Sequence, residues 1–261
     1  MEVKGFSSRF LGQAEQEKSK SFEKLSSGKR INRASDDAAG LAIVAALESS
    51  VRSTAQASRN ISDGVSLTQI VDSSLEQINT LNARKQELAA QAANGTLSDA
   101  QRASLNDEYQ AANEEIDRIA QTTSFNGQNL LSGSSEITLQ VGTEADANSQ
   151  ITLNFSNVAA TPGDISTQAG AQAALDSSQT AISDVSQLRG QIGSVVNRLE
   201  AAQSNNSSRI ENEQAAASRI RDVDVANETA NLTRNKILSE ASVAIQAQAN
   251  ISQSQVLKLL N

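Results

Sequence analysis

Apolar residues recur every three or four positions along most of this chain, which is the spacing of one face of an α-helix. The most regular run lies within residues 175–202. Its apolar residues form one stripe along about 40 Å of helix, at 1.5 Å per residue. Ser, Gln and Asn fill the other positions, so burial of the stripe against other helices must stabilise this segment. We predict that the core stripe consists of Ile182, Val185, Leu188, Ile192, Val195 and Leu199.

Two more helices are predicted in the first half of the chain. A stripe from Leu47 to Leu88 indicates one helix of about 50 residues. Asn94-Gly95 predicts its end, because Gly adopts the left-handed conformation that closes a last helical turn. Ser98 and Gln101 form a capping box, which predicts that an antiparallel helix begins there.

The period of the pattern changes from helical to two after residue 127. Residues 136–141 and 151–155 alternate between apolar and polar side chains on either side of a polar loop. This pattern predicts a β-hairpin near 136–156. The chain's one proline, Pro162, precedes Gly163 and predicts the turn back into helix.

Both ends of the chain carry weak stripes. Residues 1–35 have a thin apolar stripe and eight Lys or Arg against four Glu, an asymmetry that suggests an interacting end. Ordering a residue costs roughly 1–2 kcal/mol of backbone entropy, so we expect these arms to need other copies of the chain. The carboxy-terminal stripe consists mainly of small and polar residues: Ala226, Ala230, Thr233, Ile237, Ala241, Ala244, Gln248 and Ile251.

The whole pattern predicts a mainly α fold, a long antiparallel helical bundle or coiled-coil rod with one β-hairpin. Composition agrees, because 38% of the 261 residues are hydrophobic and only 2% are aromatic. Such a composition builds a slender core of Ala, Leu, Ile and Val rather than a deep pocket.

Composition also argues against catalysis. The chain has no Cys, His or Trp, which removes thiol and imidazole chemistry and the commonest zinc ligands. Glu144, Asp146 and Asn148 alternate like the start of a calcium loop, but Ser149 and Phe155 occupy the positions of its glycine and its bidentate Glu. We therefore predict no enzyme, no cofactor and no metal.

Charge and hydropathy limit the partners. The net charge of −8 opposes binding to nucleic acids and to anionic membranes. No apolar run of 18 residues is present, and residues 1–35 lack the apolar core of a secretory signal peptide. If the protein leaves the cell, we expect it to use another route.

Several motifs resemble the terminal signatures of bacterial flagellins. The amino-terminal matches are Lys24–Asn32, Ser35–Ile43, Ser58–Gly64 and Ser124–Gln128, and the carboxy-terminal matches are Ser218–Asp224 and Gln246–Leu260. The resemblance implies a structural subunit that polymerises into the flagellar filament for motility. It also implies that residues 1–40 and 225–261 form the inner filament core, and that residues 41–175 and 176–224 form the surrounding helical rod.

The resemblance implies further properties. About fifteen residues separate Phe155 from the next helix, so the large outer domains of many flagellins are absent. The chain is expected to be exported through the flagellar type III channel with a chaperone on its carboxy-terminal arm, to meet a capping protein, and to reside outside the cell. Two alternatives are a hook-filament junction protein of the same family and a flagellin-like surface binding protein.

One segment resembles the region by which a flagellin-sensing Toll-like receptor detects many flagellins. The residues that match are Arg84, Glu87 and Leu88, with Glu108 on the neighbouring helix. Arg84 and Leu88 are four residues apart, so the resemblance implies a ridge in which Arg84 pairs with receptor carboxylates and Leu88 fills a pocket.

Overall fold

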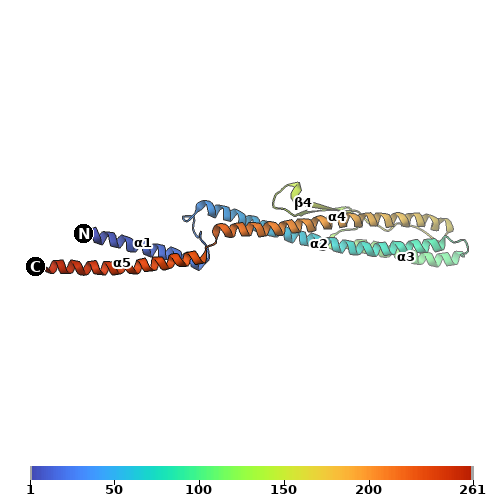
Figure 1. Cartoon of the computed structure of the whole chain (residues 1–261). Helices are drawn as coiled ribbons and strands as arrows, with labels where there is room; N and C mark the ends of the chain where they lie inside the picture. The colour runs from blue at the N-terminus through green and yellow to red at the C-terminus, as the bar shows by residue number, and fades with distance from the viewer. Residues whose placement is uncertain (1, 260–261) are drawn as a thin grey trace. The chain divides into compact units, whose positions relative to one another are not determined.

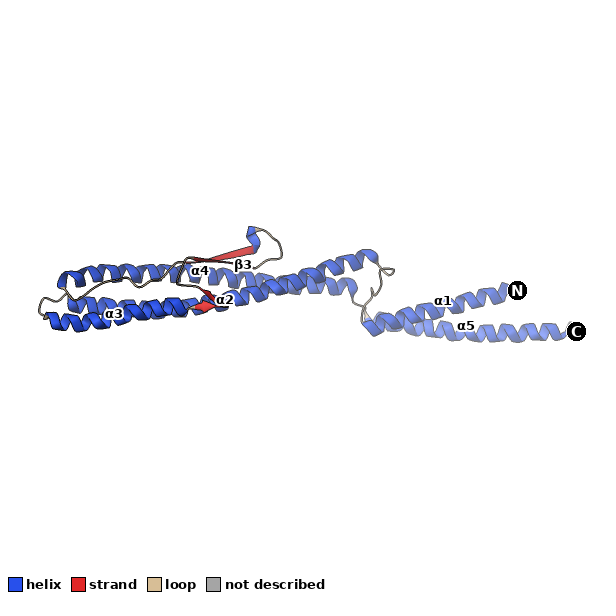
Figure 2. Cartoon of the chain, turned by 180° about the vertical axis from the view of Figure 1, so that it is seen from behind, coloured by secondary structure: helices blue, strands red, loops and turns tan. Residues whose placement is uncertain are grey.

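The computed structural model describes residues 2–259, and long helices dominate this part of the chain (Figures 1 and 2). The predicted mainly α class is confirmed. Among the described residues the helices are α1 (Glu2–Ser27), α2 (Ala38–Ala92), α3 (Asp99–Thr122), α4 (Gln168–Arg221) and α5 (Val225–Leu259). Helix α4 is longer than the stripe within residues 175–202 suggested, because its polar stretches continue the same helix.

The predicted hairpin is confirmed. Strand β3 (Ser135–Gln140) pairs antiparallel with β4 (Gln150–Phe155), and a short 3₁₀ turn, η1 (Ala147–Ser149), lies in the loop between them. A second, smaller pair was not predicted: β1 (Ser124–Phe125) and β2 (Gln128–Asn129). Its two turn residues, Asn126 and Gly127, have φ values of 49° and 79°, as a type I′ turn requires.

The chain divides into two compact units. The central unit spans Arg52–Ile210, and the terminal unit comprises the residues up to Val51 and those from Glu211 on. Helices α2 and α4 contribute residues to both units. The filament domains implied by the resemblance, with limits near residues 40 and 225, stay a prediction.

The core of the central unit joins α2, α3, α4 and the hairpin. Figure 1 shows α3 lying along α2, with α4 alongside. Leu75 and Ile78 of α2 are completely buried in one cluster with Ile116 of α3 and Ile192 of α4. Leu153 and Phe155 of β4 complete the cluster, which contains few rings, as the composition predicts.

Two amides and a glycine attach the hairpin to the helices. Asn60 of α2 donates a hydrogen bond to the carbonyl of Gln140 (3.0 Å), and Asn206 of α4 donates one to that of Val141 (2.9 Å). A Cβ on Gly64 would lie 2.2 Å from Leu139 Cδ1, so the hairpin can approach α2 this closely only at a glycine. Asn60 and Gly64 both belong to the signature-like motif Ser58–Gly64.

The corner between α2 and α3 confirms one prediction and corrects another. The capping box of Ser98 and Gln101 is present. Helix α2 does end at this corner, but Gly95 is not in the left-handed region, so the predicted mechanism is wrong. Arg102 instead donates to the carbonyl of the last residue of α2, Ala92 (3.0 Å), and to that of Asn94 in the following turn (3.1 Å).

Residues 156–167 form an extended strap before α4 rather than a tight turn. Side chains of α3 bind its backbone: Asp117 accepts from Ala160 N (2.9 Å) and Asn106 accepts from Ile165 N (3.0 Å). Pro162 lies within this strap, and the helix that it was predicted to precede begins only at Gln168.

Lys85 of α2 is fully buried beneath the strap, which no sequence pattern predicted. Its Nζ donates to the carbonyl (3.1 Å) and to the hydroxyl (3.2 Å) of Thr161 and lies 4.9 Å from the ring centroid of Tyr109. Burial lowers the pKa of Lys85 to about 8, and the carboxylate of Asp117 opposes this shift. An amine with this pKa is partly neutral in mildly alkaline solution.

We expect Lys85→Met to change how stability depends on pH. In the unfolded chain Lys85 keeps its proton up to its ordinary pKa of 10.5, whereas the folded protein releases it near 8. The unfolded state therefore binds more protons between these values, so the free energy of unfolding rises with pH, by at most about 3 kcal/mol. Urea unfolding followed by circular dichroism should show this rise in the parent and not in the variant. Identical pH profiles would contradict the assignment.

Candidate assembly surface

The loop between α1 and α2 brings the two ends of the chain together within the terminal unit. Gly28, directly after α1, has a φ of 68°, the left-handed conformation that ends many helices. The amide of Val223 donates to Gly28 O (3.0 Å), and Arg30 N donates to Arg221 O (2.6 Å). Backbone hydrogen bonds thus join the two signature-like motifs Lys24–Asn32 and Ser218–Asp224.

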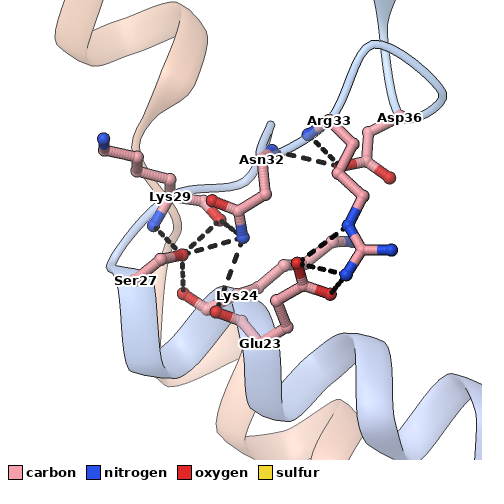
Figure 3. Close-up of polar contacts among 7 residues, drawn as sticks. All are labelled: Glu23, Lys24, Ser27, Lys29, Asn32, Arg33 and Asp36. Carbon is pink, nitrogen blue, oxygen red and sulfur yellow. Dashed lines mark hydrogen bonds and ion pairs between the residues drawn. The ribbon is translucent and has the colours of Figure 1, made fainter.

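Side chains hold this loop against the end of α1 (Figure 3). Asn32 donates from Nδ2 to Ser27 Oγ (2.8 Å), and the amide of Lys29 also donates to Ser27 Oγ (3.2 Å). The guanidinium of Arg33 donates to both carboxylate oxygens of Glu23, at 3.0 and 3.1 Å. The loop is therefore fixed by polar contacts together with the burial of Ile31, which is 3% exposed.

Two adjacent carboxylates organise the rest of the loop. Asp36 accepts hydrogen bonds from the amides of Arg33 (2.9 Å) and Asn32 (3.1 Å), and these bonds lower the pKa of Asp36 below its ordinary value. The contribution of Asp36 to the stability of the fold is therefore present above its ordinary pKa and is lost as the pH falls through the lowered pKa. Asp37 caps α2 by accepting from Gly40 N (2.8 Å).

Helix α5 packs on α1 through its polar face. Ser21 of α1 and Ser239 of α5 are buried, and the side chains of α5 least exposed to solvent recur at helical spacing around Ser239. These side chains are Glu228, Asn231, Leu232, Asn235, Ser239, Ser242, Gln246 and Ala249. A contact face of this composition buries little apolar area, so it stabilises the pair weakly.

The apolar stripe predicted for the carboxy-terminal arm lies on the opposite face of α5. Residues two positions along a helix point about 200° apart, which separates the stripe around Ile237 from the contact face at Asn235. The stripe residues Ala226 to Ile251 are all exposed, with Ile237 60% and Ile251 51% accessible. Thr229, Ala230, Thr233, Arg234, Ile237 and Leu238 form an open, largely apolar patch on this helix.

The predicted rod-core stripe lies on α4 in the central unit. Leu199 is completely buried, and Val185, Leu188 and Ile192 are at most 5% exposed. Ile182 and Val195 are half-buried.

The residues predicted to contact a receptor do not form one exposed ridge. Arg84 is half-exposed and donates to Glu108 Oε1 (2.9 and 2.6 Å) and to Glu87 Oε2 (3.1 Å). These contacts raise the pKa of Arg84. Leu88 is 1% exposed and packs inside the cluster that contains Tyr109. Leu88 is therefore not placed to fill a receptor pocket, because the core stripe requires the same side chain.

The calcium-like segment has a structural role instead. Asp146 accepts from Ser149 N (2.9 Å) and from Asn148 Nδ2 (3.2 Å), so it caps η1. Within residues 2–259 no group of three or more acidic side chains is placed to hold a metal ion.

Comparison with known families accounts for the two motifs that meet at the loop after α1. The bacterial flagellin N-terminal helical region matches residues 7–136, and the C-terminal helical region matches residues 175–260. A flagellin from Halalkalibacterium halodurans is 44% identical over 249 residues, which cover 92% of this chain and 91% of that protein. The chain belongs to the bacterial flagellin family. It is a flagellar filament subunit of the short form.

Solved structures agree with this identification. The crystal structure of Bacillus cereus flagellin matches with a TM-score of 0.51 and 32% identity, over 57% of this flagellin and 88% of that chain. A putative flagellar hook-associated protein from Vibrio parahaemolyticus gives a TM-score of 0.62, covering 72% of this flagellin and all of that chain, at 16% identity. Its similarity shows the fold alone, so the hook-junction alternative gains no support.

The sequence patterns identified the loop after α1 and the stripe of α5, but not what these residues contact. The motif Lys24–Asn32 was recognised as a signature, but the contacts of Asn32 and Arg33 were not predicted. The stripe of α5 was found by its spacing, whereas its exposure was not. The polar residues around Ser239, which repeat at the same helical spacing, were the signal that another face contacts α1.

We expect Gly40→Ala to loosen the loop after α1. A Cβ at Gly40 would lie 2.4 Å from Asp37 Oδ2 and 2.9 Å from Ile31 Cδ1, so the cap of α2 must shift. The expected cost is about 1 kcal/mol, the size of a lost N-cap. Trypsin should cleave faster after Lys29, Arg30 and Arg33, measured by mass spectrometry of timed digests.

Gly12→Ala is the matched control for this experiment. Gly12 lies within α1 and has no neighbouring atom within 4 Å of an added Cβ. Alanine is preferred over glycine inside a helix, so this variant should be cleaved in the loop no faster than the parent. Equal cleavage of all three proteins would show that the cap does not order the loop.

Proposed function

We propose that this flagellin polymerises through the outer face of α5. The observation that carries the proposal is the exposed stripe from Ala226 to Ile251, which α1 does not cover. Exposed apolar faces of this length are a free-energy cost in water that contact with another molecule removes. Because α1 occupies the opposite face of the helix, a neighbouring copy can bind the stripe without displacing it.

The form of the polymer follows from the kind of contact. One copy's stripe packs on a different surface of the next copy, which is a head-to-tail interface. Interfaces of this kind that do not close into a ring generate helical filaments. The terminal unit contains equal numbers of acidic and basic residues, so the entire net charge of −8 lies in the central unit. Contact between terminal units is therefore not opposed by net charge.

The proposed role is structural rather than catalytic. Membership of the flagellin family supports it, since the relatives are structural proteins. The composition supports it as well, because Cys, an intrinsically strong nucleophile, and His, the most frequent general acid or base, are absent from the sequence.

Export and assembly require further partners, which we propose from the family. A chaperone covers the exposed stripe of α5 before polymerisation, the chain leaves through the flagellar type III channel, and a capping protein receives it outside the cell. The exposed large apolar residues Ile237, Leu238 and Ile245 support this, because they would promote premature association. None of the helices described between residues 2 and 259 is long and apolar enough to cross a membrane.

The last proposed partner is a Toll-like receptor that senses flagellin. The exposed ion-pair cluster of Arg84, Glu87 and Glu108 offers charged groups for such a contact, without Leu88. Neighbouring copies in a filament compete for this surface, so the monomer is the species that binds.

Ile237→Ser should abolish polymerisation while leaving the monomer folded. The side chain is 60% exposed, so its loss opens no cavity in the monomer, and polymer contacts lose the centre of the stripe. Electron microscopy and sedimentation of concentrated protein measure polymerisation, and circular dichroism measures folding. Lys236→Ala, whose side chain points about 100° away on the same helix, should still form filaments. Filaments from Ile237→Ser as abundant as those of the parent would refute the stripe as an interface.

Deletion of residues 230–261 should abolish binding to the chaperone, measured by co-purification. Most of the exposed stripe is then missing, whereas the contacts of the loop after α1 remain. Undiminished binding would place the chaperone's site elsewhere on the chain.

Arg84→Ala should weaken receptor binding by on the order of 1–2 kcal/mol. A titration of monomer against the receptor ectodomain measures it. Arg118→Ala is the matched control, since Arg118 is another exposed arginine paired on α3, with Glu115. No measurable binding by the parent, or equal binding by both variants, would remove the receptor from the list of partners.

A further inference from the structure

We infer that Asn94 is a site of spontaneous deamidation, a chemical modification at the corner between α2 and α3. The backbone nitrogen of Gly95 attacks the side-chain carbonyl carbon of Asn94, closing a five-membered succinimide and releasing ammonia. Water then opens the ring and leaves aspartate or isoaspartate. The net reaction converts an amide and water into a carboxylic acid and ammonia, with no oxidation or reduction.

The attacking nitrogen is unhindered. Asn94 and Gly95 are both exposed, and the amide of Gly95 donates no hydrogen bond to any described residue. A Cβ at Gly95 would meet only the Nε2 atom of Gln168, at 3.6 Å. Neither a side chain nor a competing acceptor therefore shields the nitrogen.

The carbonyl that it attacks is polarised. The amide of Thr96 donates to Asn94 Oδ1 at 3.2 Å. Negative charge develops on this oxygen during the attack, and a fixed N–H donor stabilises such charge. The chain thus supplies an electrophile and a nucleophile on adjacent residues of one exposed corner.

The second Asn-Gly pair is an internal control. Asn126 and Gly127 are also exposed, but they form the type I′ turn between β1 and β2. A type I′ turn is the mirror image of a type I turn, so ψ of its first central residue, here Asn126, is about +30°. This places the Gly127 nitrogen nearly opposite the Asn126 side chain across the Cα–C bond, so ring closure requires the turn to open.

The modification acts on the cap of α2. The buried guanidinium of Arg102 donates to Ala92 O and to Asn94 O. Aspartate at position 94 adds a negative charge beside this guanidinium. Isoaspartate moves the main chain into the side chain, and the oxygen that Arg102 binds becomes part of a carboxylate. If subunits of the proposed filament are not exchanged, the product accumulates with age. This accumulation, unlike the reaction itself, rests on the proposed function.

Incubation of the purified monomer in warm, mildly alkaline buffer tests the inference. Peptide mass spectrometry measures conversion at Asn94 and Asn126, and a protein isoaspartyl methyltransferase labels the isoaspartate. We expect conversion at Asn94 to be at least about tenfold faster, because the Gly95 nitrogen is unhindered whereas the type I′ turn holds the Gly127 nitrogen away from the Asn126 side chain. In urea the two sites should react at similar rates. Equal rates in the folded protein, or no conversion at Asn94, would overturn the inference.

Gly95→Ala is the decisive variant. Gly95 does not have a positive φ and has room for a methyl group, so the variant should keep the fold. The methyl group hinders attack by the adjacent nitrogen, and conversion at residue 94 should fall by about tenfold. An unchanged rate would show that the amide is hydrolysed without the succinimide. The experiment uses monomer only, so its outcome is independent of whether the protein polymerises.

Discussion

The contact between α2 and α4 in the central unit supports every other feature of that unit. Leu75 and Ile78 on one helix and Leu188 and Ile192 on the other are buried together, and α3 and the hairpin add to the same cluster. With so few aromatic residues, no single side chain anchors this core. Burial of many aliphatic side chains, each worth about 1.5–3 kcal/mol, must therefore accumulate along the helices.

The terminal unit follows the opposite principle. The contact face of α5 on α1 is mainly polar, with Leu232 and Ala249 among its serines and asparagines, while most of the larger apolar side chains of α5 remain exposed to water. Polar contacts of Ser27, Asn32, Arg33, Asp36 and Asp37 hold the loop after α1. A unit built in this way is held in shape by hydrogen bonds but leaves its apolar surface available to another chain, as a self-assembling subunit needs.

Buried or half-buried polar groups mark the points where irregular backbone crosses the helices. Lys85 and Asp117 bind the strap, Asn60 and Asn206 bind the hairpin, and Arg102 binds the end of α2. Each of these side chains hydrogen-bonds to main-chain atoms where a helix or strand ends or the backbone is irregular, which explains why the charged residues Lys85 and Arg102 are buried.

Local patterns in the sequence determined the helices, the hairpin, the capping box and the family. Helical spacing, alternation and Ser98 with Gln101 depend on neighbours along the chain, so they can be read without a structure. Tertiary structure decided which of two helical faces of α5 meets α1, that Leu88 serves the core, and that Arg102 rather than Gly95 closes α2. Those outcomes depend on groups far apart in the sequence or on competition between two similar faces, and neither spacing nor composition ranks one face above the other.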